Sequence, residues 1–530
     1  MRQGCEWKFE RASQRTMELL HVYFIHLVAF LLGSVCPSCA WNDTTGFYLL
    51  YTSNEAIMRS IPVQFNPALP DWVNGTIVHN GPGMFEVNGR KLGHLFDGFA
   101  KPIEWRFDGH GHARFTTDFL KTESYRDSMN MRDVAPYILY MPPSPPFSWM
   151  SKMRQMANGL DNVNINVARI KGQYMFISDI WKFYMANPGK WYVKQVYPSV
   201  PESFGMLQRF ALSSSHPLPD DSKKPDGAHI NFYALPMIGG GHTVHLCKIL
   251  SPTKREFFGE VSLGNLPYMH CFGATKEFVI LFGHPLYVDP YQMLLTQAAA
   301  QAFVWKPKDG SKVYIVHKRT GKVYTFSTGA FTVTHHVNAY ETEGGKIVAD
   351  FVTYPDPIPF AMFKMNIIKN QTARDNLAIS KARIRRFIFD LNLNVVKQIR
   401  TPNFDSLANR LEMPIINEKF RFRPYCYVYG LTMSSDEKNF ADFRLVKRDM
   451  CTGNDTWWGR PGFYPSEPRF IARPGATEED DGFVFSTILN GREKVSYLAV
   501  YDAKTMREIS YSYLPTFVPF LLHGQYFSST

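Results

Sequence analysis

The sequence predicts an all-β protein, which in a chain of 530 residues means a barrel, a sandwich or a propeller. Short segments of about four to eight residues, rich in Val, Ile, Phe and Tyr, alternate between apolar and polar positions. Asn-Gly, Asp-Gly and Gly-Gly pairs separate many of these segments, as expected for turns between strands. Helical candidates are few. The aromatic content of 15% suits strands, an apolar ligand tunnel or an ordinary β core.

Strands are expected where the alternation is clearest. They are 172–177, 277–282, 312–316, 322–326, 331–340, 347–352, 383–390 and 483–489. The best helical candidate is 290–304, with Pro290 at its start and an Ala-rich middle. The sequence contains no clean internal repeat and no low-complexity linker long enough to divide it. We therefore interpret residues 41–530 as one large domain.

Residues 1–40 are interpreted as a leader, either a secretory signal peptide or a short membrane anchor. The run 19–35 is apolar except for two histidines, follows several basic residues and precedes the small-residue pattern Ser38-Cys39-Ala40. A disordered leader from a mispredicted start is the alternative. No other stretch reaches about 18 apolar residues, so the body is not expected to cross a membrane.

Two further features depend on the compartment. The seven cysteines are too few and too scattered for a disulfide scaffold. Four Asn-x-Thr sequons begin at Asn42, Asn74, Asn370 and Asn454. They matter only if the chain enters the secretory pathway.

The net charge of +11 suggests an acidic partner, either nucleic acid or an anionic membrane surface. The basic residues are scattered, and no helix-turn-helix, zinc-finger or RNP signature is present. We therefore expect no nucleic-acid partner.

A pair of histidines, His335 and His336, follows a β-branched run in the expected strand 331–340. Successive side chains on a strand point to opposite faces, so only one of the two can face a given site. A histidine in a β protein is usually a satisfied core or surface residue, so the pair alone does not define a site.

A series of motifs along the chain carries more information than any of them alone. They are Asn74-Gly75-Thr76, His79-Asn80-Gly81-Pro82-Gly83-Met84-Phe85-Glu86, His94-Leu95-Phe96-Asp97-Gly98, Ser215-His216-Pro217, His270-Cys271-Phe272-Gly273, His335-His336-Val337-Asn338-Ala339-Tyr340-Glu341, Tyr464-Pro465-Ser466-Glu467-Pro468, Glu478-Glu479-Asp480-Asp481-Gly482 and His523-Gly524. In their order the chain resembles the carotenoid cleavage dioxygenases, which include β-carotene oxygenases and the isomerohydrolase of the retinal pigment epithelium. The resemblance covers about residues 50–530.

This resemblance implies a seven-bladed β-propeller, with few helices capping one face and ferrous iron on its axis. Four histidines from four inner strands would hold the iron and leave open positions for oxygen. The matching positions are His216, His270, His335 and His523. His335 is assigned rather than His336 because the family ligand lies three residues before the Asn. Imidazole ligands without thiolate or carboxylate suit Fe(II).

The family also places three glutamates behind the metal ligands, where a carboxylate fixes the ring and tautomer of a bound histidine. Two of these positions match, at Glu412 and Glu467, and the third falls on Asp179. Aspartate is one methylene shorter, so we expect its link to the ligand to need a backbone shift or a water. Turn capping by Glu467 and solvent exposure of Asp179 are the alternatives.

Two segments are candidates for a membrane surface. Residues 136–156 combine Tyr140, Phe147 and Trp149 with Lys152 and Arg154. Mammalian members have a Cys-containing stretch where this chain has the Pro-rich 142–146, so a Pro-rich loop packed on the body is the alternative. Residues 290–304 are expected to add Met293 and Leu294 or to form a packed surface helix.

The resemblance implies a membrane-associated non-haem iron dioxygenase that splits a polyene double bond, and analogy with its animal members makes β-carotene cleaved to retinal the best substrate. The alternatives are a retinoid isomerohydrolase, an apocarotenoid- or stilbene-cleaving enzyme, and a non-catalytic lipid-binding propeller. For the location, the alternative to the secretory pathway is a cytoplasmic peripheral membrane protein.

Overall fold

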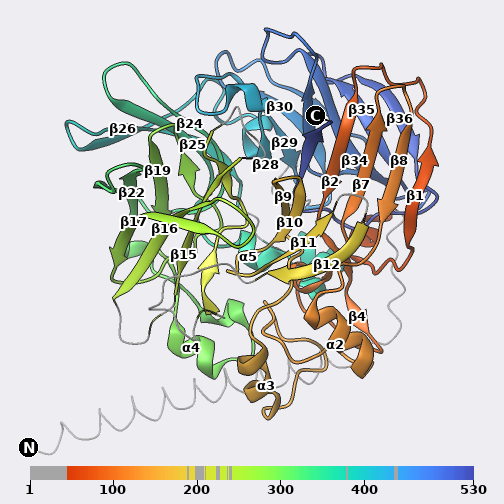
Figure 1. The fold of residues 1–530 in the computed structure, drawn as a ribbon, viewed down its shortest axis with the longest axis horizontal. Helices are drawn as coiled ribbons and strands as arrows, with labels where there is room; N and C mark the ends of the chain where they lie inside the picture. Colours follow the sequence, from red (N-terminus) through yellow and green to blue (C-terminus); the bar gives the residue numbers. More distant parts are fainter. Residues whose placement is uncertain are drawn as a thin grey trace, which may run out of the picture. The chain divides into compact units, whose positions relative to one another are not determined.

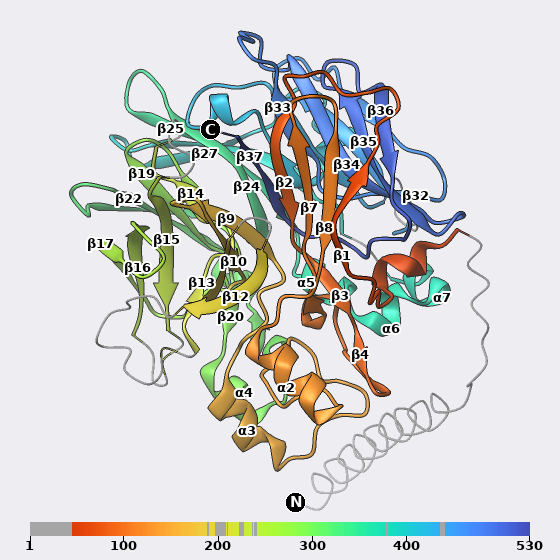
Figure 2. The same ribbon diagram turned by 45° about the vertical axis from the view of Figure 1, so that its right-hand side comes forward.

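The computed structural model describes residues 45–530 except 188–189, 197–207, 209, 222–226, 236, 238–240, 378–379, 435–439 and 530. The expected leader, 1–40, lies outside the described residues. Seven antiparallel sheets surround a common axis, so the predicted seven-bladed β-propeller is confirmed (Figures 1 and 2).

Four blades each contain four strands in sequence order from the axis outward. They are β9 (Asn166–Ile170), β10 (Gln173–Ile177), β11 (Phe183–Asn187) and β12 (Lys190–Val196); β18 (Gly273–Ala274), β19 (Phe278–Gly283), β22 (Ser311–His317) and β23 (Val323–Thr328); β24 (Thr332–Glu341), β25 (Lys346–Tyr354), β26 (Arg383–Asp390) and β27 (Val395–Ile399); β28 (Glu412–Ile415), β29 (Tyr427–Thr432), β30 (Arg444–Asp449) and β31 (Thr456–Trp458).

In two blades the inner strand is divided into two short pieces that both pair with the next strand. They are β13 (Leu212–Ser213), β14 (Leu218–Pro219), β15 (His229–Ala234), β16 (His242–Ile249) and β17 (Arg255–Leu263); β32 (Phe463–Pro465), β33 (Arg469–Ala472), β34 (Gly482–Asn490), β35 (Val495–Asp502) and β36 (Glu508–Tyr513). The break in each inner strand leaves room for a side chain that points to the axis.

The remaining blade closes the ring, because it joins strands from both ends of the described chain. It contains β37 (Gly524–Ser528), β2 (Asn74–His79), β7 (Ile103–Asp108), β8 (Ala113–Thr117) and β1 (Met58–Val63) in that order. The last strand, β37, pairs antiparallel with β2, from Gly75↔Ser528 to His79↔Gly524. Figure 2 shows β37 beside β2.

The core lies between neighbouring blades, where alternating residues of facing sheets interdigitate. Between the closing blade and the β32–β36 blade, Trp105 and Phe115 are buried together with Phe485. The Phe107 and Phe485 ring centroids lie 5.5 Å apart across this interface. Each strand expected from the sequence is present, shifted by one or two residues at most, because the alternation that predicts a strand also fills these interfaces.

The helices are few and short, as predicted. The α-helices are α2 (Glu123–Met131), α3 (Ser151–Asn158), α4 (Pro290–Leu295), α5 (Pro359–Met362), α6 (Met365–Ile368) and α7 (Gln371–Asp375). There are also three two-stranded ribbons: β3 (Pro82–Met84) with β6 (Phe99–Ala100), β4 (Glu86–Val87) with β5 (Arg90–Lys91), and β20 (Leu286–Val288) with β21 (Phe303–Trp305). In both ribbon views α2, α3 and α4 gather beyond one end of the blades (Figures 1 and 2). Among the described residues, no helix has both the length and the apolar character that crossing a bilayer requires.

The predicted helix 290–304 is wrong beyond Leu295. The α4 helix ends at Leu295, and the hydroxyl of the capping residue Thr296 donates back to the Gln292 carbonyl oxygen at 2.6 Å. The chain then pairs with residues just before the Pro-rich 142–146, because the amide of Ala299 donates to the Leu139 carbonyl oxygen at 2.8 Å. A short 3-10 helix, Ala299–Ala302, follows. Pairing between distant segments therefore overrides the local helical pattern.

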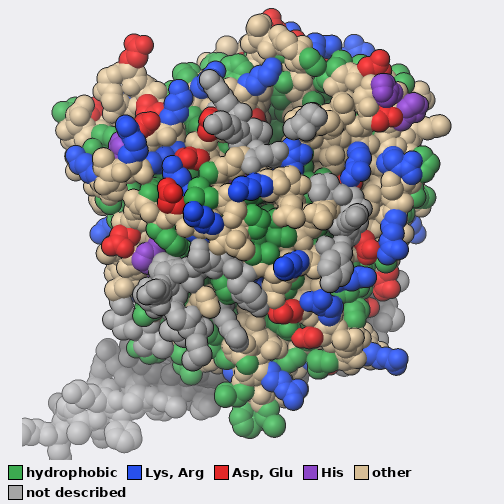
Figure 3. Space-filling view, in the orientation of Figure 1, with side chains coloured by type: hydrophobic (Ala, Val, Ile, Leu, Met, Phe, Trp, Pro, Cys, Tyr) green, Lys and Arg blue, Asp and Glu red, His purple; other side chains and the backbone are tan. Residues whose placement is uncertain are grey.

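The two predicted membrane segments meet, because the Lys152 ammonium group donates to the carbonyl oxygens of Met293, at 3.0 Å, and Thr296, at 2.5 Å. Six large apolar side chains remain exposed on and beside the two helices, and we name them the α3–α4 patch. They are Trp149, Met150, Met153, Tyr291, Leu294 and Leu295. Figure 3 shows hydrophobic side chains at the lower edge of the molecule over α3, with cations beside them.

Three of the side chains predicted to meet the membrane do not belong to this patch. Phe147 is only 7% exposed, since it packs in a core cluster under the Arg90 guanidinium group. Tyr140 is half-buried and its hydroxyl donates to the Phe360 carbonyl oxygen at 3.3 Å. Lys152 neutralises the carbonyl end of α4. The composition of this segment predicts an apolar surface, but it does not predict which of its apolar side chains are buried in the fold.

Candidate metal centre

The structure brings the four predicted histidines together at the axis. His216 lies between β13 and β14, His270 precedes β18, His335 is on β24 and His523 directly precedes β37. One ring nitrogen of each lies within 4.8 Å of the others. The Nε2 atoms of His216 and His270 are 3.0 Å apart, and those of His335 and His523 are 3.2 Å apart. Two nitrogens bound to one metal at about 2.1 Å and a right angle lie about 3.0 Å apart, so the spacing fits a single ion.

A carboxylate lies behind three of the four rings. Glu412 contacts the Nδ1 atom of His335 at 2.6 Å, and Glu467 contacts that of His523 at 2.9 Å. A nitrogen that faces a carboxylate carries the proton, so Nε2 of each ring presents its lone pair to the centre. Two such lone pairs facing each other repel unless a cation lies between them. The donor set therefore fits a resident metal ion.

Asp179 supplies the third carboxylate, and it makes the contact directly. Its Oδ2 atom accepts from His270 Nδ1 and from the Tyr268 hydroxyl, each at 2.7 Å. The expectation that the shorter side chain needs a water is wrong. Ile180 forms a bridge with Leu212, and the Ser215 amide donates to Asp179 Oδ1 at 2.9 Å, so the segment after β10 is tied to the neighbouring blade.

The electrostatics favour the ionised forms of Asp179 and Glu412. Burial alone would raise the pKa of Asp179 and of Glu412, but the paired imidazoles and the hydrogen bonds outweigh burial and hold both pKa values below their usual range. Burial, together with the neighbouring histidines, lowers the pKa of His216 and His523 well below the usual range. These two rings are therefore neutral, which is the form that binds a metal.

The seven groups come one from each blade. The histidines belong to the β13–β17, β18–β23, β24–β27 and closing blades, and the carboxylates Asp179, Glu412 and Glu467 belong to the other three. The inner ends of all seven blades meet at the axis, so each blade needs only one inward side chain to complete the arrangement.

His336 lies outside the cluster, as the strand alternation predicts. Its ring packs against Phe351 with centroids 5.1 Å apart. The pairing of β24 with β25 shifts between Val333 and His335 and again between His336 and Asn338. Such irregularities re-aim side chains, and here they flank the histidine that faces the axis.

An apolar cavity ends at the cluster and supplies the lining residues that the sequence alone does not number. It reaches His270, His335 and His523 and is lined mainly by large apolar side chains, among them Phe96, Leu139, Tyr140, Ile165, Tyr268, Met293, Phe303, Phe360, Met362 and Phe363. Met293 lies on α4 between residues of the exposed patch. The apolar cavity therefore runs from the neighbourhood of that patch toward the four histidines.

A second, polar cavity of about 630 Å³ also reaches the histidines. Its lining shares only His335 and His523 with the apolar cavity and includes Arg169, His216, His336, Lys419, Arg421 and Arg469. Arg469 forms an ion pair with Glu467, the carboxylate behind His523. The four histidines thus lie between two cavities, one apolar and one lined partly by cations.

Sequence reasoning missed the residues that hold the carboxylates. The Thr334 hydroxyl donates to Glu412 at 2.8 Å, and the Gly524 amide donates to Glu467 at 2.9 Å. The one available signal is adjacency, since each residue neighbours a predicted histidine in the chain. Tyr268, which donates to Asp179, likewise lies two residues before His270.

Comparisons with known proteins agree with this arrangement. The family model described as "Retinal pigment epithelial membrane protein" matches residues 51–528. A carotenoid cleavage dioxygenase 8 homolog A from rice is 28% identical over 484 residues, covering 87% of this chain and 84% of the relative. The mouse β,β-carotene 15,15'-dioxygenase is 24% identical over 525 residues, covering 88% and 89%.

A solved structure supports the fold. A mutant of the Synechocystis apocarotenoid oxygenase superposes with a TM-score of 0.79 at 21% identity, covering 92% of this chain and 100% of that chain. Because the family model spans most of the sequence and all seven blades, the chain belongs to the retinal pigment epithelial membrane protein family, the family of the carotenoid oxygenases.

Proposed function

We propose that this chain is a non-haem iron dioxygenase that oxidatively cleaves a double bond of a carotenoid polyene to give aldehydes or ketones. The observation that carries the proposal is the apolar cavity that ends at three of the four clustered histidines. A polyene fits such a cavity because it offers apolar surface and no hydrogen-bonding groups along its length. β-Carotene cleaved to retinal is the first substrate to test, because relatives of this chain are named as β,β-carotene dioxygenases.

In this proposal His216, His270, His335 and His523 hold Fe(II), and Asp179, Glu412 and Glu467 orient three of the rings. Bound iron supplies the oxidation chemistry with molecular oxygen. The chain itself positions the polyene against the cluster and excludes bulk water with its apolar walls. The carboxylates hold the Nδ1 protons in place, so that the ring nitrogens facing the centre stay available.

The test is aerobic incubation of the iron-loaded protein with β-carotene, with product identification and oxygen uptake measured together. We expect retinal or a shorter carbonyl product, with oxygen consumed in step with it. A parallel incubation uses a retinyl ester as substrate. Conversion of that ester without oxygen uptake would instead identify an isomerohydrolase. Protein that binds the polyene but leaves it intact, with iron present, would identify a lipid-binding propeller.

The three carboxylates are expected to contribute equally. Loss of an outer carboxylate typically lowers metal affinity or activity about 10–100-fold. We expect Glu412→Gln, Glu467→Gln and Asp179→Asn all to fall in this range, because Asp179 contacts His270 as closely as the glutamates contact their partners. The measurement is the iron content after dialysis against a chelator, with kcat/KM of the reloaded protein.

The matched control for these variants is Glu418→Gln. Glu418 lines the polar cavity and pairs with Arg421, but its side chain is 63% exposed and touches none of the four histidines. It should retain iron and activity. A loss at Asp179→Asn much smaller than at Glu412→Gln would contradict the direct contact.

We also propose that the α3–α4 patch docks on a membrane surface and that the leader directs the chain to the secretory membranes. A carotenoid is nearly insoluble in water, so its enzyme should take it from a bilayer. The patch exposes Trp149, Met153 and Leu295 beside the apolar cavity, with the exposed Arg154 available to lipid headgroups.

A further inference from the structure

The four cysteines in the described part of the chain are either paired in a disulfide or buried, and none of them is a ligand of the proposed metal centre. Cys426 and Cys451 form a disulfide, with their Cα atoms 5.2 Å apart. Among the described residues the unpaired cysteines, Cys247 and Cys271, are both buried. No exposed thiol is therefore left in the described part of the chain. Such a pattern is typical of proteins that fold in an oxidising compartment, and it does not depend on the leader.

The disulfide joins the open ends of the β29–β30 hairpin. Cys426 precedes β29 and Cys451 follows β30, and the Met450 amide donates to the Cys426 carbonyl oxygen at 2.8 Å. Forming the bond removes two electrons and two protons from the thiols. A disulfide-bearing oxidoreductase accepts both, as in any oxidising folding compartment.

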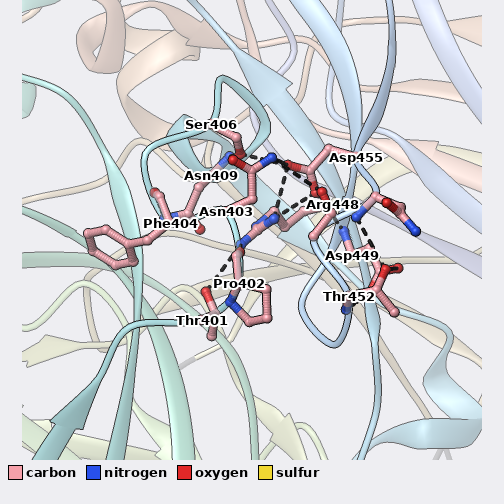
Figure 4. Close-up of polar contacts among 12 residues, drawn as sticks. Thr401, Pro402, Asn403, Phe404, Ser406, Asn409, Arg448, Asp449, Thr452 and Asp455 are labelled. Carbon is pink, nitrogen blue, oxygen red and sulfur yellow. Dashed lines mark hydrogen bonds and ion pairs between the residues drawn. The ribbon is translucent and has the colours of Figure 1, made fainter.

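Several side-chain hydrogen bonds fix the turn that follows Cys451 (Figure 4). The Arg448 guanidinium group donates to both carboxylate oxygens of Asp455, at 2.7 and 2.9 Å. Asp449 accepts from the Thr452 amide at 2.9 Å and from the Thr452 hydroxyl. The sequon residue Asn454 lies in this turn, is exposed and makes no side-chain hydrogen bond to the described residues. The fold thus presents its amide to solvent.

A second sequon, at Asn370, is also presented. Asn370 is exposed and caps α7, because its side-chain oxygen accepts from the Ala373 amide at 3.0 Å. The side-chain nitrogen has no partner among the described residues. A substituent on that nitrogen leaves the oxygen free to keep the cap.

Asn74, by contrast, is exposed, but both polar atoms of its side chain have close neighbours. Its side-chain oxygen accepts from the Ser529 hydroxyl at 2.8 Å. Its side-chain nitrogen lies 3.2 Å from the position that a Cβ atom on Gly109 would occupy. A substituent on that nitrogen starts beside the β7–β8 turn, so this sequon is more crowded than the other two.

We infer that the folded domain carries N-linked glycans at Asn370 and Asn454. In the reaction the side-chain nitrogen bonds to the first sugar carbon of a lipid-pyrophosphate-linked oligosaccharide. The bond from that carbon to the phosphate oxygen breaks, the lipid pyrophosphate leaves and the amide loses one proton. In Figure 1 β30 and α3 lie at opposite ends of the view, so a glycan after β30 leaves the α3–α4 patch free.

The experiment is expression of the full chain in eukaryotic cells, followed by electrophoresis with and without peptide N-glycosidase. We expect the enzyme to lower the apparent mass and, in ¹⁸O water, to convert Asn370 and Asn454 to labelled aspartate. Non-reducing peptide mapping should recover the Cys426–Cys451 pair. A chain that resists the glycosidase, or that is modified at Asn74 in place of these two, would overturn the inference.

Matched variants separate glycan loss from misfolding. Asn370→Asp keeps the oxygen that caps α7 but removes the sequon, and Thr372→Ser keeps the sequon. Asn454→Gln removes the second site. We expect Asn370→Asp and Asn454→Gln each to remove one step of the mass shift, while Thr372→Ser leaves the shift unchanged. Since none of these residues lies near the histidines, iron content should stay constant in all three.

Discussion

Replacement of any one of His216, His270, His335 or His523 by alanine is expected to abolish iron retention and activity. Each ring supplies one of four nitrogens that lie within 4.8 Å of one another. Losing the ring removes a bond to the metal, and for His270, His335 and His523 it also leaves a buried carboxylate without its hydrogen-bond donor. The loss should exceed the 10–100-fold that is typical of an outer carboxylate. Metal analysis of the purified protein and oxygen uptake measure it.

His336→Ala is the internal control, because it is the chain neighbour of a proposed ligand and has the same chemistry. Its ring packs on Phe351 and lies outside the cluster. The variant should keep iron, and thermal unfolding should show only the cost of a partly buried ring. Iron lost from His336→Ala but kept by His335→Ala would place the ligand one residue further along β24.

The second large effect is expected at the α3–α4 patch. Trp149 and Leu295 are 82% and 80% exposed. Burying a large apolar side chain contributes about 1.5–3 kcal/mol, so Trp149→Ser with Leu295→Ser should weaken binding to anionic liposomes by about 3 kcal/mol, or about 100-fold. Co-sedimentation of the protein without residues 1–40 measures this. The iron content should not change.

The variant Phe147→Ser tests whether Phe147 inserts into the membrane or packs in the protein core. Because Phe147 is buried, truncating it should destabilise the fold by about 3–5 kcal/mol, as for other buried phenylalanines, and should not selectively release the protein from liposomes. If the double variant is folded and still binds liposomes at low salt as well as the protein without residues 1–40 does, the α3–α4 patch has no role in membrane binding. Failure of that shorter protein to bind at all would assign docking to the leader.

The sequence predicted the strands and the four histidines for different reasons. Strands followed from the alternation that each blade interface demands, and the edges of β26 agree with the pattern to the residue. The histidines followed from ordered motifs, since spacing alone does not bring residues as distant as His216 and His523 together. The identity of the ligand in the His335–His336 pair rested on its distance to Asn338.

What the sequence could not give depends on contacts between distant segments. Asp179 lies next to the Ile180–Leu212 bridge between two blades, and the segment after α4 pairs with Leu139. Phe147 and Trp149 are two residues apart and similar in character, yet one is buried and the other exposed. The Cys426–Cys451 pair spans a hairpin whose existence only the blade register reveals.

The metal centre takes one side chain from each of the seven blades, so it is complete only when the whole ring has formed. This affects when the protein can acquire its metal during synthesis. The fourth histidine, His523, precedes the last strand, and β37 must pair with β2 near the other end of the described chain before the ring closes. A nascent chain that still lacks His523 therefore holds at most three of the four nitrogens. Metal loading is expected only after β37 has been synthesised and has paired with β2, and a nascent chain stalled before residue 523 should not retain iron. A cell short of iron would then accumulate full-length, folded and empty protein that later loading can activate.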